Sequence, residues 1–184
     1  GRLGTGGSYF FIAGGTGGST HSGIRFVNDS SQRPCTISGG NLDNTVAWGA
    51  SNARWELVYS VGGTTSTSDR NEKQDIEELS DAEQRVAVAA KGLLRKYRWR
   101  KAVAEKGDDN ARIHFGIIAQ DLQDAFAAEG LDAARYGMWC SDTFWVDSEG
   151  ETYDTQEEAP EGATEQTRLG VRYAQLLAFI IAAI

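Results

Sequence analysis

Two patterns of apolar and polar residues follow one another along the chain. Through the first 67 residues, short apolar and β-branched runs are interrupted by Gly, Ser and Asn, which is typical of strands joined by turns. This pattern argues strongly against a helix in this segment. The predicted strands cover residues 8–13, 23–28, 35–38, 45–48 and 55–61.

From residue 80 onward the apolar residues recur at helical spacing. Ser80 and Glu83 match the pattern of a capping box, which predicts a helix that includes the alanine-rich stretch 86–94. A second helix is predicted for residues 119–128, because its apolar residues share one face and Gly130 follows as a C-terminal cap.

Strands are predicted between and after these two helices. Residues 96–103 alternate in character and residues 112–117 return after a turn at 107–110, which together predict a hairpin. The aromatic stretch 139–153, with its turn at 147–150, is expected to project as a ribbon. We expect the acidic stretch 157–165 to be a solvated loop. A calcium-binding loop is not expected there, because its glycine and carboxylates do not fall at the required spacing.

The C-terminal residues predict a strongly apolar helix over 171–184. Leu177, Ile181 and Ile184 recur three to four residues apart, and further apolar residues widen this stripe. A helix this apolar needs partner helices, so we expect these three residues to pack in a seam between chains.

The composition changes near residue 68. Residues 1–67 contain 14 of the 22 glycines, no lysine and a net charge of +1, whereas the remainder carries −9. The chain therefore divides into a β-rich segment, residues 1–67, and a mixed helical and β segment, residues 68–184. Strands so rich in glycine bury too little apolar surface to offset their chain entropy alone, so we expect the first segment to be oligomeric.

Charge and composition exclude several classes of function. A net charge of −8, without aromatic residues interleaved among lysines, argues against binding of nucleic acid. The apolar run 173–184 is shorter than the about 20 residues of a membrane span, so no membrane insertion is expected. Cys35 and Cys140 are expected to be reduced thiols. Since no common metal, nucleotide or Ser-His-Asp motif occurs, no metal and no cofactor are expected.

A serine and a lysine at the boundary of the two segments are the candidates for chemistry. Lysine can activate a serine hydroxyl only as a neutral amine, so its surroundings must lower its pKa from about 10.4. On a continuous helix Ser68 and Lys73 would lie about 140° apart, so they can meet only across a bend. The spacing alone is equally that of Ser68 or Asp69 capping a turn with Lys73 in solvent.

Three blocks of sequence resemble those of a known family. They begin at Ser68, His114 and Val171 and read Ser-Asp-x-x-x-Lys-x-Asp-Ile, His-Phe-Gly-Ile-Ile-Ala-Gln-Asp and Val-Arg-Tyr-x-x-Leu-Leu-Ala. In this order they resemble the self-cleaving intramolecular chaperone at the C-terminus of phage tail spikes, tail fibres and neck appendages, the peptidase S74 family. Residues 48–60 resemble an element that often precedes this domain in tail fibres, so the resemblance covers 47–184.

The resemblance implies a homotrimer whose C-terminal domain aligns three chains and then cuts itself off. Ser68 would be the nucleophile and Lys73 the base, with the scissile bond between Thr67 and Ser68. Asp69 and His114 are candidate supporting residues, although a helix cap for Asp69 and a packing role for His114 are the simpler interpretations. Residues 70–72 depart from the family pattern, and a carboxylate at Glu72, next to Lys73, would favour the charged form of Lys73.

The sequence thus predicts an α+β chain in an elongated, intertwined homotrimer that ends in a helical bundle or coiled coil. The expected place is the tail fibre of the virion, joined to the upstream shaft, after folding and processing in the bacterial cytoplasm. Two alternatives stay open. One is a structural trimerisation module that does not cleave, and the other is a fibre tip whose residues 1–67 bind a host-surface receptor.

Overall fold

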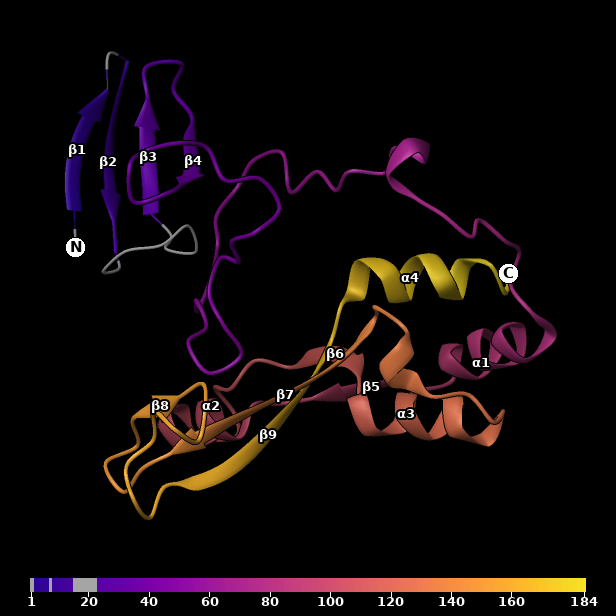
Figure 1. The fold of residues 1–184 in the computed structure, drawn as a ribbon. Coiled ribbons are helices and arrows are strands. Elements are labelled where there is room, and N and C mark those ends of the chain that lie inside the picture. The colour runs from indigo at the N-terminus through magenta and orange to yellow at the C-terminus, as the bar shows by residue number, and fades with distance from the viewer. Residues whose placement is uncertain (1, 7, 15–22) are drawn as a thin grey trace. The chain divides into compact units, whose positions relative to one another are not determined.

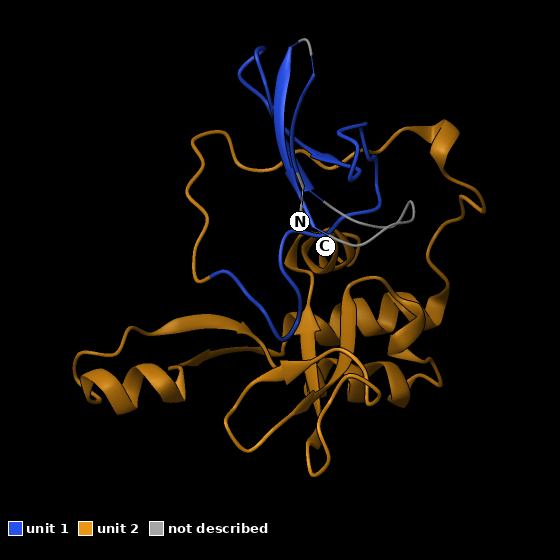
Figure 2. Ribbon diagram, turned by 60° about the vertical axis from the view of Figure 1, so that its left-hand side comes forward, with its two compact units in different colours: residues 1–55 blue, residues 56–184 orange. Residues whose placement is uncertain are grey.

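The computed structural model describes residues 2–6, 8–14 and 23–184. The chain divides into two compact units, Gly1–Trp55 and Glu56–Ile184 (Figure 2). Residues 56–79 of the second unit form no helix or strand apart from one 3-10 turn, η1 (Arg70–Glu72). The sequence-based division between Thr67 and Ser68 falls within this irregular segment and remains a prediction.

The first unit is an antiparallel sheet whose strands pair in chain order (Figure 1). The strands are β1 (Arg2–Gly6), β2 (Tyr9–Ala13), β3 (Gly23–Val27) and β4 (Gln32–Cys35). The predictions of strands at 8–13 and 23–28 are confirmed. β4 includes Pro34, which cannot donate a ladder hydrogen bond and is tolerated because β4 is an edge strand.

Three other predictions for this segment are wrong. The strand expected at 35–38 lies earlier, as β4, because Thr36 opens a turn whose Gly39 has φ +85°. The strands expected at 45–48 and 55–61 do not form, and their apolar side chains, such as Trp48 and Val58, are exposed without a partner strand. β1 was not predicted, since its glycines mask the alternation of its side chains.

The core of the first unit is small. Among its described residues, the buried side chains of the apolar core are those of Phe11, Ala13 and Cys35, and burial raises the pKa of the Cys35 thiol. Successive side chains of a strand point to opposite faces. The other face therefore carries apolar side chains that remain exposed, namely Leu3, Phe10, Ile12 and Phe26. Such a surface on so small a unit is typical of one that is covered in an assembly.

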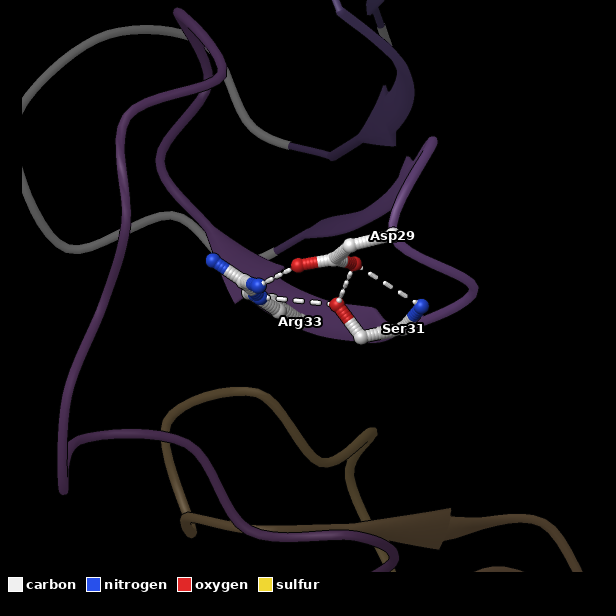
Figure 3. Close-up of polar contacts among 3 residues, drawn as sticks. All are labelled: Asp29, Ser31 and Arg33. Carbon is white, nitrogen blue, oxygen red and sulfur yellow. Dashed lines mark hydrogen bonds and ion pairs between the residues drawn. The ribbon is translucent and has the colours of Figure 1, made fainter.

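Asp29 holds the turn between β3 and β4 (Figure 3). Its Oδ1 accepts hydrogen bonds from the N–H of Ser31 at 3.0 Å and from the hydroxyl of Ser31 at 2.5 Å. Its other carboxylate oxygen pairs with the guanidinium of Arg33, whose Nε donates to Ser31 Oγ at 2.8 Å. These partners, Ser31 first, hold the pKa of Asp29 below its usual value.

In the second unit, the core is built mainly from helices, with residues of the strands packed against them. The helices are α1 (Asp81–Lys91), α2 (Arg100–Lys106), α3 (Ala119–Ala128) and α4 (Tyr173–Ile181), with the 3-10 turn η2 (Ala133–Arg135). The most completely buried side chains of this core are Val86, Leu122, Phe126 and Leu176. They come from α1, α3 and α4, so these three helices pack on one another.

The predicted start of α1 and the predicted end of α3 are confirmed, whereas the helix expected through residue 94 ends at Lys91, because Leu94 pairs with Ile117 in a strand. At the start of α1, Ser80 Oγ accepts from the N–H of Glu83 at 3.4 Å, and Glu83 Oε2 accepts from the N–H of Ser80 at 2.7 Å. After α3, Gly130 adopts φ +72° and Leu131 N–H donates to the carbonyl of Phe126 at 2.9 Å, which is a Schellman motif.

β5 (Leu94–Tyr97) and β6 (His114–Ile117) pair antiparallel, as the predicted hairpin requires. The strand predicted through residue 103 is wrong, because Arg100–Lys106 forms α2. Alternating polar and apolar residues in this stretch favour a strand, but its residues are good helix formers. The Lys101–Glu105 ion pair, at helical spacing, also favours the helix.

A three-stranded sheet follows, with β7 (Trp139–Val146) between β8 (Thr152–Tyr153) and β9 (Thr164–Val171). The ribbon predicted at 139–153 is confirmed by the pairing of Trp145 with Tyr153. The acidic loop ends earlier than predicted, because Thr164 already pairs with Val146. For the same reason the last helix begins at Tyr173 rather than Val171, whose backbone pairs with Trp139.

Two further properties concern the cysteines and the helices of the described part of the chain. Cys35 and Cys140 are free thiols. None of the helices there has the length and apolar character needed to cross a bilayer.

Candidate active site

Ser68 and Lys73 lie in direct contact. Lys73 Nζ donates to Ser68 Oγ at 2.6 Å, although five residues separate them. The chain bends between them through η1, with Asp69 and Lys73 flanking the turn in extended conformations. The sequence-based expectation that the two side chains can meet only across a bend is therefore confirmed, whereas their catalytic roles stay a prediction.

Asp69 supports this turn from its N-terminal end. Its Oδ1 accepts from both the backbone N–H and the side-chain amide of Asn71, each at 2.9 Å. The backbone closes with Glu72 N–H to the Asp69 carbonyl and Lys73 N–H to the Arg70 carbonyl, each at 3.2 Å. Asp69 thus acts as a cap, the simpler of the two roles that the sequence allowed.

Both members of the Ser68–Lys73 pair are exposed to solvent, as are residues 61–78 on either side. Water stabilises the ammonium form of a lysine, and only the neutral amine can take a proton from a hydroxyl. The isolated chain therefore brings the two groups together but does not exclude water from them.

His114 lies in β6 and belongs to an aromatic cluster. Its ring stacks on Tyr97 at a centroid distance of 5.9 Å and meets Trp99 edge-on at 6.2 Å. Within the described ranges, no interaction joins His114 to Ser68 or Lys73. The packing role is the one that its contacts support.

The predicted seam residues lie on the outer face of α4 and beyond its end. Leu176 and Phe179 of this helix are buried, while Leu177, Ile181 and Ile184 are 56%, 66% and 92% exposed. One side of the helix thus packs on the core and the other presents an apolar stripe, which we call the α4 stripe. That it forms an interface remains a prediction.

The second and third sequence blocks meet in space, which the sequence did not predict. Tyr173 Oη accepts from the N–H of Ile117 at 3.1 Å. Arg172 donates from its guanidinium to the carbonyl of Gly137 at 2.5 Å and from its N–H to the carbonyl of Met138 at 2.8 Å. The sequence offered one indirect signal: Ile117 and Tyr173 both belong to blocks that resemble the same family.

No group of His, Cys, Asp and Glu side chains within residues 2–6, 8–14 and 23–184 could hold a metal ion.

Comparison with known proteins identifies the family. The family model Peptidase_S74, described as the chaperone of endosialidase, matches residues 68–131. A crystal structure described as a novel intramolecular chaperone is 32% identical, with a TM-score of 0.50, and the match covers 63% of this chain and 93% of that one. The chain belongs to the peptidase S74 family. Membership implies self-cleaving peptidase activity in general terms.

This peptidase S74 chain is similar to tail spikes and fibres. It is 39% identical over 127 residues to a probable tail spike protein of Klebsiella phage 0507-KN2-1, covering 66% of this chain and 10% of that protein. The carboxy-terminal domain of the bacteriophage T5 L-shaped tail fibre, solved with its intramolecular chaperone domain, shares the fold with a TM-score of 0.58 at 23% identity, covering 100% of this chain and 50% of that one. The chain thus spans a small part of the Klebsiella phage relative and half of the T5 structure.

Proposed function

We propose that this chain directs the homotrimeric folding of a phage tail fibre or spike and then releases its chaperone by cleavage between Thr67 and Ser68. Residues 1–67 would stay with the fibre, and residues 68–184 would be the released chaperone. The observation that carries the proposal is the 2.6 Å contact between Lys73 Nζ and Ser68 Oγ, within the segment matched by the family model.

The reaction is an acyl shift followed by hydrolysis. Lys73 accepts the Ser68 hydroxyl proton as Oγ attacks the carbonyl carbon of Thr67, which forms a C–O bond in a small ring. The C–N bond between Thr67 and Ser68 then breaks, and Lys73 returns the proton to the leaving amine. Water hydrolyses the ester, which leaves a carboxylate on Thr67 and restores the Ser68 hydroxyl. Proximity within the turn supplies much of the rate.

Assembly would complete the site. Lys73 and Ser68 are exposed in the single chain, so a lysine base requires a further surface to remove water from its amine. Neighbouring copies supply such a surface if three chains pack around the segment that contains the bond. Cleavage is then coupled to correct assembly.

Two exposed apolar surfaces support a trimer. One is the α4 stripe, and the other is the face of the first sheet that carries Leu3 and Ile12, which are 70% and 51% exposed. Strands rich in glycine specify their register weakly. A trimeriser raises the local concentration of three such strands, and its removal leaves the fibre trapped behind a high unfolding barrier.

The intact mass of freshly expressed protein tests this proposal. The wild-type chain should yield two fragments, and N-terminal sequencing of the C-terminal one should read Ser-Asp-Arg-Asn-Glu. Ser68→Ala should remain whole, whereas the neighbouring Ser66→Ala should be cut as in the wild type. A C-terminal fragment that begins elsewhere would refute the assignment of the bond.

The second candidate is a structural trimerisation module that does not cleave. The exposure of both Ser68 and Lys73 favours it, because a hydrated ammonium is a poor base. A wild-type chain that stays whole as a stable trimer for days would decide for this candidate.

A further inference from the structure

Residues 94–117, which comprise β5, α2 and β6, form an arm with little core of its own. α2 has no buried residue, and the exposed fractions of Leu94, Trp99, Ile113 and Phe115 are 58%, 56%, 51% and 69%. Two strands without a covered apolar face are marginally stable in water. This arm therefore needs a surface to pack against.

The same arm is strongly basic, so we call it the basic arm. It carries seven Lys and Arg against three Asp and Glu, a net charge of +4. Arg95 and Arg98 donate to backbone carbonyls, and the pair between Lys101 and Glu105 is long, at 3.7 Å, and exposed. Since exposed pairs of this kind contribute little, its positive charge is available to a partner.

A hollow on the basic arm brings apolar and charged side chains together. Its lining consists of two cationic residues, one carboxylate and three apolar or aromatic residues, namely Lys96, Arg98, Asp108, Tyr97, Val103 and Ile113. Such a lining suits a partner surface that carries carboxylates beside aromatic or aliphatic groups.

The three-stranded sheet and its loops, residues 139–171, have the opposite charge, and we call them the acidic arm. They carry nine Asp and Glu against Arg168, a net charge of −8, equal to that of the whole chain. Most of these carboxylates are exposed. Figure 1 shows β8 and α2 both lying away from α1 and α3, so each arm extends beyond the helices that form the core.

The tip of the acidic arm has a fixed shape. Asp147 accepts from the N–H groups of Glu149 and Glu151 and from the hydroxyl of Tyr153, each at 2.9 Å. The hydroxyl of Tyr153 contributes most to holding the pKa of Asp147 below its usual value. The turn therefore presents its remaining carboxylates on a defined backbone, which lowers the entropy lost on binding.

We propose that the basic arm of one copy binds the acidic arm of a second copy, so that charge complementarity sets which faces of neighbouring chains meet. This inference rests on the proposed assembly of three copies. The competing occupant is the exposed segment 72–78, but its net charge of −3 is much smaller in magnitude than the −8 of the acidic arm. Opposite charge steers encounter and disfavours wrong pairings, and salt weakens both effects.

Charge reversal tests the contact in the full Ser68→Ala chain, which is used to keep the chain whole. Reversing two charges of the basic arm (Arg100→Glu with Lys101→Glu) or two of the acidic arm (Glu157→Lys with Glu158→Lys) should weaken association at least tenfold by light scattering across a dilution series. Combining both reversals should restore it to within about threefold. The matched control, Glu77→Lys with Glu78→Lys, should change little.

Crosslinking identifies the partner directly. A carbodiimide joins lysine amines to carboxylates in contact, and a mixture of isotopically light and heavy chains distinguishes bonds between copies from bonds within one copy. We expect mixed-isotope peptides that join Lys96 or Lys101 to residues 149–161. Crosslinks only within one chain, only to residues 72–78 or only to residues 1–67 would overturn the proposal.

The outcomes also separate this inference from the function on which it rests. If the chain is monomeric at all concentrations, the proposed assembly itself fails. If the trimer forms but the combined reversal does not restore what each single reversal removes, only the contact between the arms fails.

Discussion

The phenol oxygen of Tyr173 lies 3.1 Å from the backbone nitrogen of Ile117 and accepts its hydrogen bond. The same oxygen lies over Gly116, where a Cβ would approach it to 2.2 Å. This contact joins the first residue of α4 to β6. It therefore connects the helix that carries the α4 stripe to the basic arm.

We expect Gly116→Ala to lower the free energy of unfolding by roughly 1–3 kcal/mol, because the added methyl group forces the Tyr173 ring away from β6. Denaturant unfolding at a fixed chain concentration measures this. Gly170→Ala is the matched control, since its Cβ would meet Cys140 at an ordinary 3.6 Å. Adding Tyr173→Phe to Gly116→Ala should recover part of the loss, and no loss in Gly116→Ala would contradict the packing constraint.

Ser80→Ala should lower stability by about 1 kcal/mol, because it removes the side-chain half of the capping box at α1. Thermal unfolding against the wild type measures the loss. Ser148→Ala, in an exposed turn, is the control. A change no larger than that of the control would mean that tertiary packing alone fixes the start of α1.

The pH dependence of stability should include a contribution from Glu83. Hydrogen bonds from Ser80, and then one from Tyr136, hold the pKa of this carboxyl below its usual value. A lowered pKa in the folded state means that the stabilisation is present above the unfolded pKa and is lost as pH falls through the folded one. Glu83→Gln should reduce the loss of unfolding free energy as the pH falls into the acid range. An unchanged pH dependence in this variant would contradict the contribution of Glu83.

Lys73→Arg should block cleavage while the assembled mass stays that of the wild type. Arginine keeps the positive charge and can still donate to Ser68, but it does not lose its proton near neutral pH. Arg70→Lys, within the same turn, is the control and should be cut. Gel electrophoresis over time measures the rate of cleavage. If Lys73→Arg is cut at the wild-type rate, Lys73 is not the base.

Leu177→Asp should give an uncut monomer or aggregate, because a charge in the α4 stripe would be buried without a partner on assembly, at a cost of several kcal/mol. Ala178→Asp, which is exposed on the same helix but outside the stripe, should assemble and cleave. Chromatography with light scattering reports the assembly state. Efficient cleavage in a monomeric Leu177→Asp chain would separate the reaction from assembly.

Features whose signal lies within a few residues could be predicted from the sequence. Ser80 with Glu83 and the glycine at position 130 mark their helix ends through hydrogen bonds that span three to five residues. The strand β9 could not be predicted, because its pairing with β7 joins Thr164 to Val146 across the acidic loop. α2 escaped prediction because alternation and helical spacing coexist in its sequence.

The candidate site shows the same division. The spacing of Ser68 and Lys73 predicted that a bend must join them, and η1 is that bend. The cap role expected for Asp69 appears as the hydrogen bond from the Asn71 N–H, whereas the second bond, from the Asn71 side-chain amide, has no signal in the spacing. The contact of Tyr173 with Ile117 depends on the folding of the whole unit and has no local signal.

The turn η1 holds Ser68 and Lys73, the proposed nucleophile and base, on the same side of the proposed bond. Once that bond is cut, both residues leave together, and the fibre keeps only the new carboxylate of Thr67. The fibre would then keep neither residue of the pair, so fibres could be stored and concentrated without this pair cutting neighbouring fibres. The departing chaperone keeps the complete pair but has lost the acyl group that Ser68 attacks, so each copy reacts once and is then inert.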